Sequence, residues 1–118
     1  MFTIIEIRGK EYKLKLRTVD IVRLEKKLGH SLMDMFMGMQ NDKIPQLGEL
    51  LAVIHAAMGA YNHGITENAF YDLYDAYVDE GHNMFDLIPI VLELMQNGGI
   101  IPKDEVIDAE VVDLKPVE

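Results

Sequence analysis

The sequence predicts an α+β fold that is mainly α, with an N-terminal β-hairpin, a small bundle of about four to five helices, and a flexible C-terminal tail. Apolar and polar residues alternate over residues 2–17, which is typical of a half-buried hairpin, and later segments repeat apolar residues at helical spacing. Residues 100–118 show neither pattern. Since 118 residues is the size of one domain, we expect residues 1–99 to form a single compact domain and residues 100–118 to be an extended, mobile tail.

The hairpin, FTIIEIRGKEYKLKLR, is expected to turn at Gly9-Lys10. Glycine at the first position of a two-residue loop suits a type II′ turn, where φ must be positive. The pairs predicted on the apolar face are Ile7 with Tyr12, Ile5 with Leu14 and Thr3 with Leu16. An isolated hairpin is marginally stable in water, so this face must pack against the helices that follow.

Two short helices are expected after the hairpin. The first covers about residues 18–28, with Thr18 as its N-cap and Gly29 in the left-handed conformation that often ends a helix. The second covers about residues 31–38 and is capped by Ser31.

Two longer amphipathic helices come next, over about residues 45–62 and 66–80. Pro45 suits the first turn of one, and Thr66 suits the N-cap of the other. In both, the apolar residues recur at the spacing that places them on one helical face.

The last helix, over about residues 83–97, is apolar nearly all round. Such a helix is buried on several sides, either within its own fold or against another chain. Pro89 is best tolerated if the regular helix begins after Asp86, because proline in a helix interior removes a hydrogen bond.

The stretch SLMDMFMGMQ (residues 31–40) has methionine at every second position from Met33 to Met39. Methionine is flexible and polarizable, so it fills irregular gaps in cores and also serves surfaces that accept varied partners. Both interpretations stay open for this segment. The methionine segment and the last helix are the two candidate surfaces for another protein. Their candidate contact residues are Met33, Met35, Phe36, Met37, Met39, Met84, Phe85, Leu87, Ile88, Val91, Leu94 and Met95.

Composition narrows the possible functions. The net charge is −9, and the positive charge is concentrated in residues 1–30. Because contacts to phosphates need a basic surface, this acidic balance does not predict a nucleic-acid binder. No apolar run is long enough to span a membrane, and no signal peptide is recognisable, so we expect a cytoplasmic protein. The chain has no cysteine, HExxH pair, GxSxG elbow or phosphate-binding glycine pattern. We therefore expect neither catalysis nor a cofactor.

The order of these elements resembles the tail assembly chaperones of long, non-contractile-tailed phages and prophages of Gram-positive bacteria. The stretches with this resemblance are GKEYKLKLRTVDIVRLEKKLGHSLMDMF and IPQLGELLAVIHAAMGAYNHGITENAFYDLYDAYVDEG, followed by an apolar helix that ends in Gly-Gly. The resemblance implies a non-catalytic protein that binds the tape measure protein and keeps it soluble until tail tube subunits assemble around it. It also implies a homo-oligomer that is absent from the mature virion, and it leaves contact with the tail tube protein open.

Two other functions are compatible with the sequence. One is an adaptor or regulator of a prophage or another mobile element, which would use the same apolar helix on a folded partner. The other is a small metal-dependent enzyme built around His82 and its acidic neighbours Asp79, Glu80 and Asp86.

Overall fold

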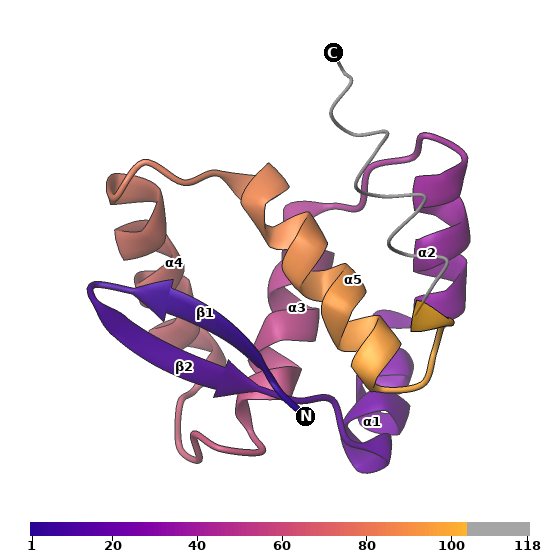
Figure 1. The fold of residues 1–118 in the computed structure, drawn as a ribbon, viewed down its shortest axis with the longest axis horizontal. Coiled ribbons are helices and arrows are strands. Elements are labelled where there is room, and N and C mark those ends of the chain that lie inside the picture. Colours follow the sequence, from indigo (N-terminus) through magenta and orange to yellow (C-terminus); the bar gives the residue numbers. More distant parts are fainter. Residues whose placement is uncertain (104–118) are drawn as a thin grey trace.

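The computed structural model describes residues 1–103 and has the predicted mainly helical α+β architecture (Figure 1). The elements of this part are β1 (Thr3–Ile7), β2 (Lys10–Leu14), α1 (Thr18–Leu28), α2 (Leu32–Gln40), α3 (Leu47–Met58), α4 (Glu67–Asp79), the 3-10 helix η1 (Met84–Asp86) and α5 (Leu87–Asn97). The prediction of a mobile tail falls almost wholly on residues 104–118, which lie outside the described residues.

The hairpin forms where predicted, but its register differs by two residues. Ile5 pairs with Tyr12 rather than with Leu14, and Thr3 pairs with Leu14 rather than with Leu16. The loop is Arg8-Gly9, and φ is positive at both residues (56° and 76°). Two successive positive φ values are the signature of a type I′ turn, so the predicted type II′ turn at Gly9-Lys10 was wrong.

A shift of two residues leaves every side chain on the face that the sequence assigned to it, because side chains alternate along a strand. Ile5, Ile7, Tyr12 and Leu14 are therefore buried as expected. On the other face, Glu6 lies opposite Glu11 in the observed register. The register follows the turn, and the buried face is the same in both registers.

The N-cap of α1 lies one residue earlier than predicted. Arg17 is the N-cap, and its backbone N–H donates to Asp20 Oδ2 over 3.0 Å. Thr18 is thus the first helical residue, which corrects the prediction that it caps the helix. The predicted left-handed Gly29 is confirmed, with φ 83°.

The side-chain caps predicted for α2 and α4 are present. Ser31 accepts from the Asp34 N–H (2.9 Å), and Thr66 accepts from the Ala69 N–H (3.1 Å). Helix α3 is shorter than the predicted 45–62, because its N-cap is Gln46, which leaves Pro45 outside the helix.

The predicted start of the last helix after Asp86 is confirmed. The preceding turn, η1, is a 3-10 helix, and Pro89 is the third residue of α5. A proline there costs little, because the first four N–H groups of a helix have no partner within it. Packing continues past residue 99, since Ile101 is only 4% exposed.

The core forms around α3, which contacts α1, α4, α5 and β2. The hairpin covers one side of the helices, with β1 against α4 and α5, and α2 stands at the opposite end of the molecule from α4 (Figure 1). The α3 side chains Leu50, Val53, Ile54 and Ala57 are fully enclosed.

Candidate protein-binding site

The structure removes most of α5 from the predicted partner surface. Leu87, Val91, Leu94 and Met95 are all fully buried within the chain's own core. Burial of such side chains is the largest favourable contribution to folding, so they cannot also face a partner in this state. The excess of apolar residues in α5 is explained by packing against α3 and β1.

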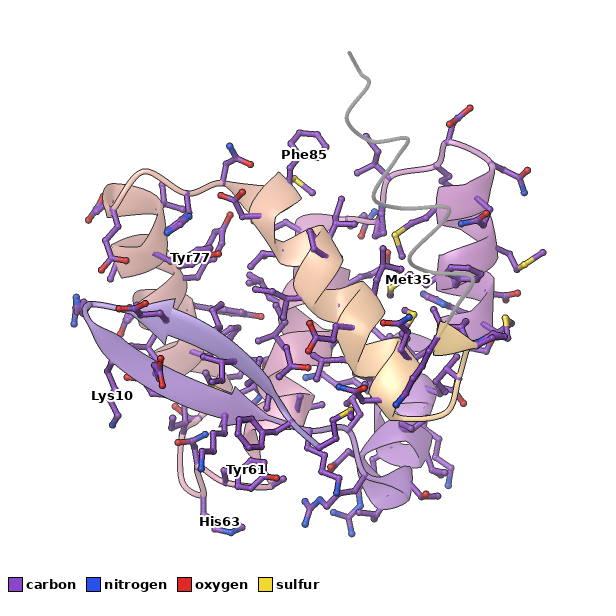
Figure 2. The ribbon with its side chains drawn as sticks, in the orientation of Figure 1. Lys10, Met35, Tyr61, His63, Tyr77 and Phe85 are labelled. Carbon is purple, nitrogen blue, oxygen red and sulfur yellow. The ribbon has the colours of Figure 1, made fainter. Side chains whose placement is uncertain are left out.

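The segment before α5 and its first turn remain partly accessible. Met84 and Ile88 are half-buried against the core, whereas Phe85 is 57% exposed and points away from the body at the start of this segment (Figure 2). An isolated exposed apolar residue is ordinary on a protein surface, so Phe85 alone does not define a site.

The methionine segment divides between core and surface. Met35 and Phe36 point inward and are 6% exposed each, while Met33 and Met37 are 42% and 51% exposed. Met39 is partly buried against the core. The two exposed methionines are four residues apart, so they lie on the same face of α2. Core filling therefore applies to Met35 and Phe36, and the partner-surface interpretation stays a prediction for Met33 and Met37.

The backbone of α2 approaches no single element as closely as α3 approaches α1 or α5, and the helix packs through its buried side chains Leu32, Met35 and Phe36. It sits at one end of the molecule beside α1 (Figure 1). Besides its Ser31 cap, it is fixed at its start by the Leu32 N–H, which donates to Glu25 Oε2 over 2.9 Å. A helix attached in this way can adjust its exposed face to a partner.

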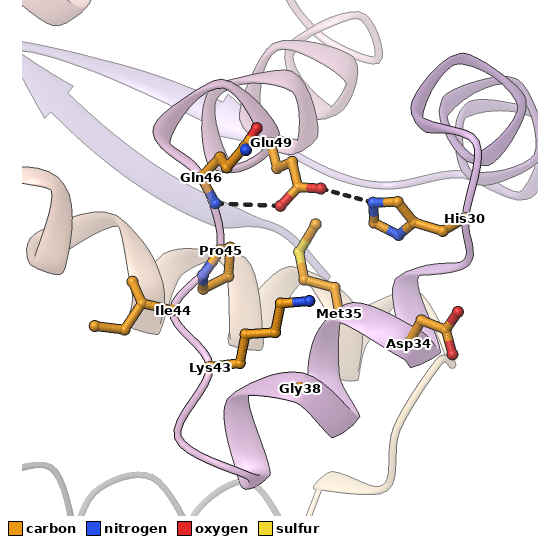
Figure 3. Close-up of a pocket in the computed structure, with 9 residues that line it drawn as sticks. All are labelled: His30, Asp34, Met35, Gly38, Lys43, Ile44, Pro45, Gln46 and Glu49. Carbon is orange, nitrogen blue, oxygen red and sulfur yellow. Dashed lines mark hydrogen bonds and ion pairs between the residues drawn. The ribbon is translucent and has the colours of Figure 1, made fainter.

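A cleft of about 470 Å³ separates α2 from the start of α3 (Figure 3). It is lined by His30, Asp34, Met35, Gly38, Lys43, Ile44, Pro45, Gln46 and Glu49. Apolar and charged side chains are mixed in this lining, and Ile44 is 56% exposed. The cleft can take an apolar side chain of a partner while Lys43 and Asp34 contact polar groups beside it.

Lys43, Ile44 and Pro45 line this cleft but were not predicted as site residues. Pro45 was expected only in the first turn of a helix. The available signal was Ile44, an apolar residue directly after the polar run QNDK. What makes it part of the site is its position opposite α2, which depends on how the loop returns along that helix, with the Lys43 N–H bound to the Gly38 carbonyl (2.8 Å).

His30 and Glu49 form a polar contact at one end of the cleft (Figure 3). Nε2 of His30 lies 2.7 Å from Oε2 of Glu49, and Nδ1 lies 3.1 Å from the carbonyl oxygen of Ser31. The hydrogen bond to Glu49 is the main cause of the raised pKa of His30, and the bond to the Ser31 carbonyl adds to it. Because both ring nitrogens face acceptors, the protonated ring satisfies both contacts.

The geometry around His82 gives little support to the hypothesis of a metal site there. His82 Nδ1 lies 3.1 Å from Asp86 Oδ2, and the ring stacks on Tyr77 with centroids 4.1 Å apart. Within residues 1–103, no group of three His, Cys, Asp or Glu side chains is arranged to hold a metal ion. In this conformation His82 therefore has one carboxylate neighbour, and a stable cation site needs more ligands.

A protein-family comparison places the whole domain in one group. A family described as a family of unknown function, DUF6096, matches residues 3–118. The chain belongs to DUF6096. No curated protein and no solved structure matches it.

The α2 surface of this DUF6096 member combines two exposed methionines with a cleft of mixed apolar and charged lining. Exposed thioethers, a cleft with mixed lining and a charged rim bind side chains. None of the helices within residues 1–103 has the length and apolarity to span a bilayer.

Proposed function

We propose that this protein is a non-catalytic tail assembly chaperone that binds the tape measure protein of a phage tail and keeps it soluble for tail tube assembly. The identity of the partner rests on the resemblance of the sequence to such chaperones. The mode of binding rests on one observation, which is the pair of exposed methionines on a loosely held helix.

This surface suits a long helical partner. A helix in an extended coiled chain presents apolar side chains that vary along its length, and flexible methionine side chains can repack against different ones. Met33 and Met37 supply such contacts, and the cleft beside α2 can receive a larger side chain. Residues 31–99 are acidic, with ten acidic residues against one lysine, and this charge keeps a complex from aggregating.

The proposal includes the remaining features that the resemblance implies. The protein acts in the cytoplasm of the bacterial host, as a homo-oligomer, and does not remain in the mature virion. Several copies would be needed along one partner, because a single α2 surface covers only a short part of a long helix. Contact with the tail tube protein would occur when the tube displaces the chaperone.

The test is co-expression with the long coiled-coil reading frame expected just downstream, followed by size-exclusion chromatography with light scattering. We expect the long chain to be soluble only with this protein, in a complex that holds several copies. The double variant Met33→Ser with Met37→Ser should lose this effect and keep its fold. A matched control is Tyr71→Ser with Val78→Ser, which also removes two exposed apolar side chains, from α4.

Two results would contradict the proposal. If the long chain stays insoluble with the wild-type protein, the tape measure role is wrong, and a defined dimer bound to one globular partner would favour the adaptor function. If the α2 variant and the α4 control solubilise the long chain equally well, the chaperone role stands but the site is not on α2.

A further inference from the structure

The outer face of the hairpin carries an exposed apolar cluster that is separate from the exposed methionines of α2. Phe2, Ile4 and Tyr61 are about 40% exposed each (41%, 39% and 44%). The rings of Phe2 and Tyr61 meet edge to face, with centroids 6.1 Å apart. In Figure 2, Tyr61 lies at the end of the hairpin where the chain begins.

Two lysines lie beside this cluster: Lys13, in β2, and Lys15, the residue just after β2. Nζ of Lys13 lies 4.8 Å above the Phe2 ring, and Lys13 pairs across the hairpin with Ile4. Lys15 is the next residue on the same face, since side chains alternate along a strand. Within residues 1–103, neither lysine forms an ion pair. We call Phe2, Ile4, Lys13, Lys15 and Tyr61 the hairpin patch.

The patch is complementary to the end of the same chain. Residues 104–118 read DEVIDAEVVDLKPVE, with six acidic residues against a single lysine, and with Val, Ile and Leu between the acids. A segment of this composition can place carboxylates against Lys13 and Lys15 and apolar side chains against the aromatic rings. The like-charged pair Glu6 and Glu11 nearer the turn favours the Phe2 end for such a segment.

The side chain of the last described residue reaches the residue before Phe2. Nζ of Lys103 lies 3.6 Å from Sδ of Met1, and the Lys103 carbonyl accepts from the side-chain amide of Gln96. The 15 residues that follow can span roughly 50 Å when extended, which is ample to cross the hairpin. Residues 104–118 also lie within the region that the family model matches.

We propose that residues 104–118 dock on the hairpin patch of their own chain, with their acidic side chains against Lys13 and Lys15 and their apolar ones against Phe2, Ile4 and Tyr61. The inference is independent of the proposed chaperone function, because it concerns a different surface and needs no partner.

The absence of cysteine from the natural chain permits a direct test. In the full-length protein, Ala109→Cys introduces a single thiol for a nitroxide spin label, and ¹⁵N NMR then reports which amides the label broadens. We expect roughly a twofold or greater loss of intensity at Phe2, Ile4 and Lys13, and a weaker effect at about 1 M salt, where charges are screened within about 3 Å. Tyr71 on α4 should be unaffected.

A charge variant with a matched control decides the cause. Lys13→Glu with Lys15→Glu should restore the lost intensity, whereas Arg23→Glu with Lys26→Glu, which makes the same charge change at exposed positions of α1, should leave it lost. The proposal is overturned if the patch is not broadened, or if both double variants behave alike. It is also overturned if an equimolar mixture of labelled ¹⁴N protein and unlabelled ¹⁵N protein shows the broadening, because the segment would then dock on another copy.

Discussion

Helices α2 and α5 look alike as sequences, since each is short, largely apolar, and without lysine or arginine. In the fold they differ sharply. Helix α5 packs against α3 and β1, and its side chains Leu87, Val91, Leu94 and Met95 are fully buried. Helix α2 lies at the end of the molecule, and its side chains Met33 and Met37 are exposed. An excess of apolar residues therefore indicates that a helix must be buried. It does not indicate whether the helix is buried by its own chain or by another one.

The first prediction tests the core side of this comparison and has the largest expected effect. Leu94→Ala in α5 should lower the free energy of unfolding by about 2–5 kcal/mol, because it removes a fully buried side chain and leaves a cavity. Urea denaturation followed by circular dichroism measures this. A loss below about 1 kcal/mol would mean that the site collapses around the gap and that α5 is less constrained than its burial indicates.

The second prediction concerns the inward face of α2. Met35→Ala also truncates a buried side chain, but we expect a loss near about 2 kcal/mol, the lower end of the usual range, because a loosely held helix can relax into the space. Amide hydrogen exchange should show α2 opening more readily than α5, in the wild type and further in the variant. Equal protection of the two helices from exchange would contradict the inference that α2 is packed less closely than α5.

The third prediction concerns the contact that joins the start of α2 to α3. The pKa of His30 is raised, chiefly by the hydrogen bond to Glu49. A group with a raised pKa in the folded state contributes stability that is fully present below its unfolded pKa, near 6.5, and is lost as the pH rises through its folded pKa. His30→Gln should remove this pH dependence, at a cost of less than about 1 kcal/mol at pH 5.5, since the pair is partly exposed.

Thermal unfolding of the wild type and of His30→Gln at several pH values between 5 and 8 checks the sign. The difference between the two proteins should be largest at the acidic end and shrink toward pH 8. A difference that grows with pH would show that the neutral ring, not the protonated one, makes the contact.

The smallest effect is expected at the exposed face of α2. Met33→Ser with Met37→Ser should change the free energy of unfolding by no more than about 0.5 kcal/mol, because surface substitutions away from caps and cores are nearly neutral. The same urea titration provides the value. A much larger loss would indicate that these methionines are part of the fold, and the α2 surface would then have to be abandoned as a binding site.

The sequence alone determined the kind and order of the elements. Alternation in the hairpin, the caps Ser31 and Thr66, the left-handed Gly29 and the late start of α5 before Pro89 are local features, so they depend on neighbouring residues and could be predicted. The face of each strand was also predictable, because it follows from a period of two.

Only the tertiary structure decided the rest. The hairpin register depended on the turn: φ is positive at both Arg8 and Gly9, whereas the predicted Gly9-Lys10 loop required a positive φ at Gly9 alone. The fate of each methionine depended on which side of α2 faces the core, and the cleft depended on the return of the loop past α2 to Ile44 and Pro45. Apolar periodicity shows that a surface must be buried, but the identity of the covering surface is a property of contacts between residues distant in the chain.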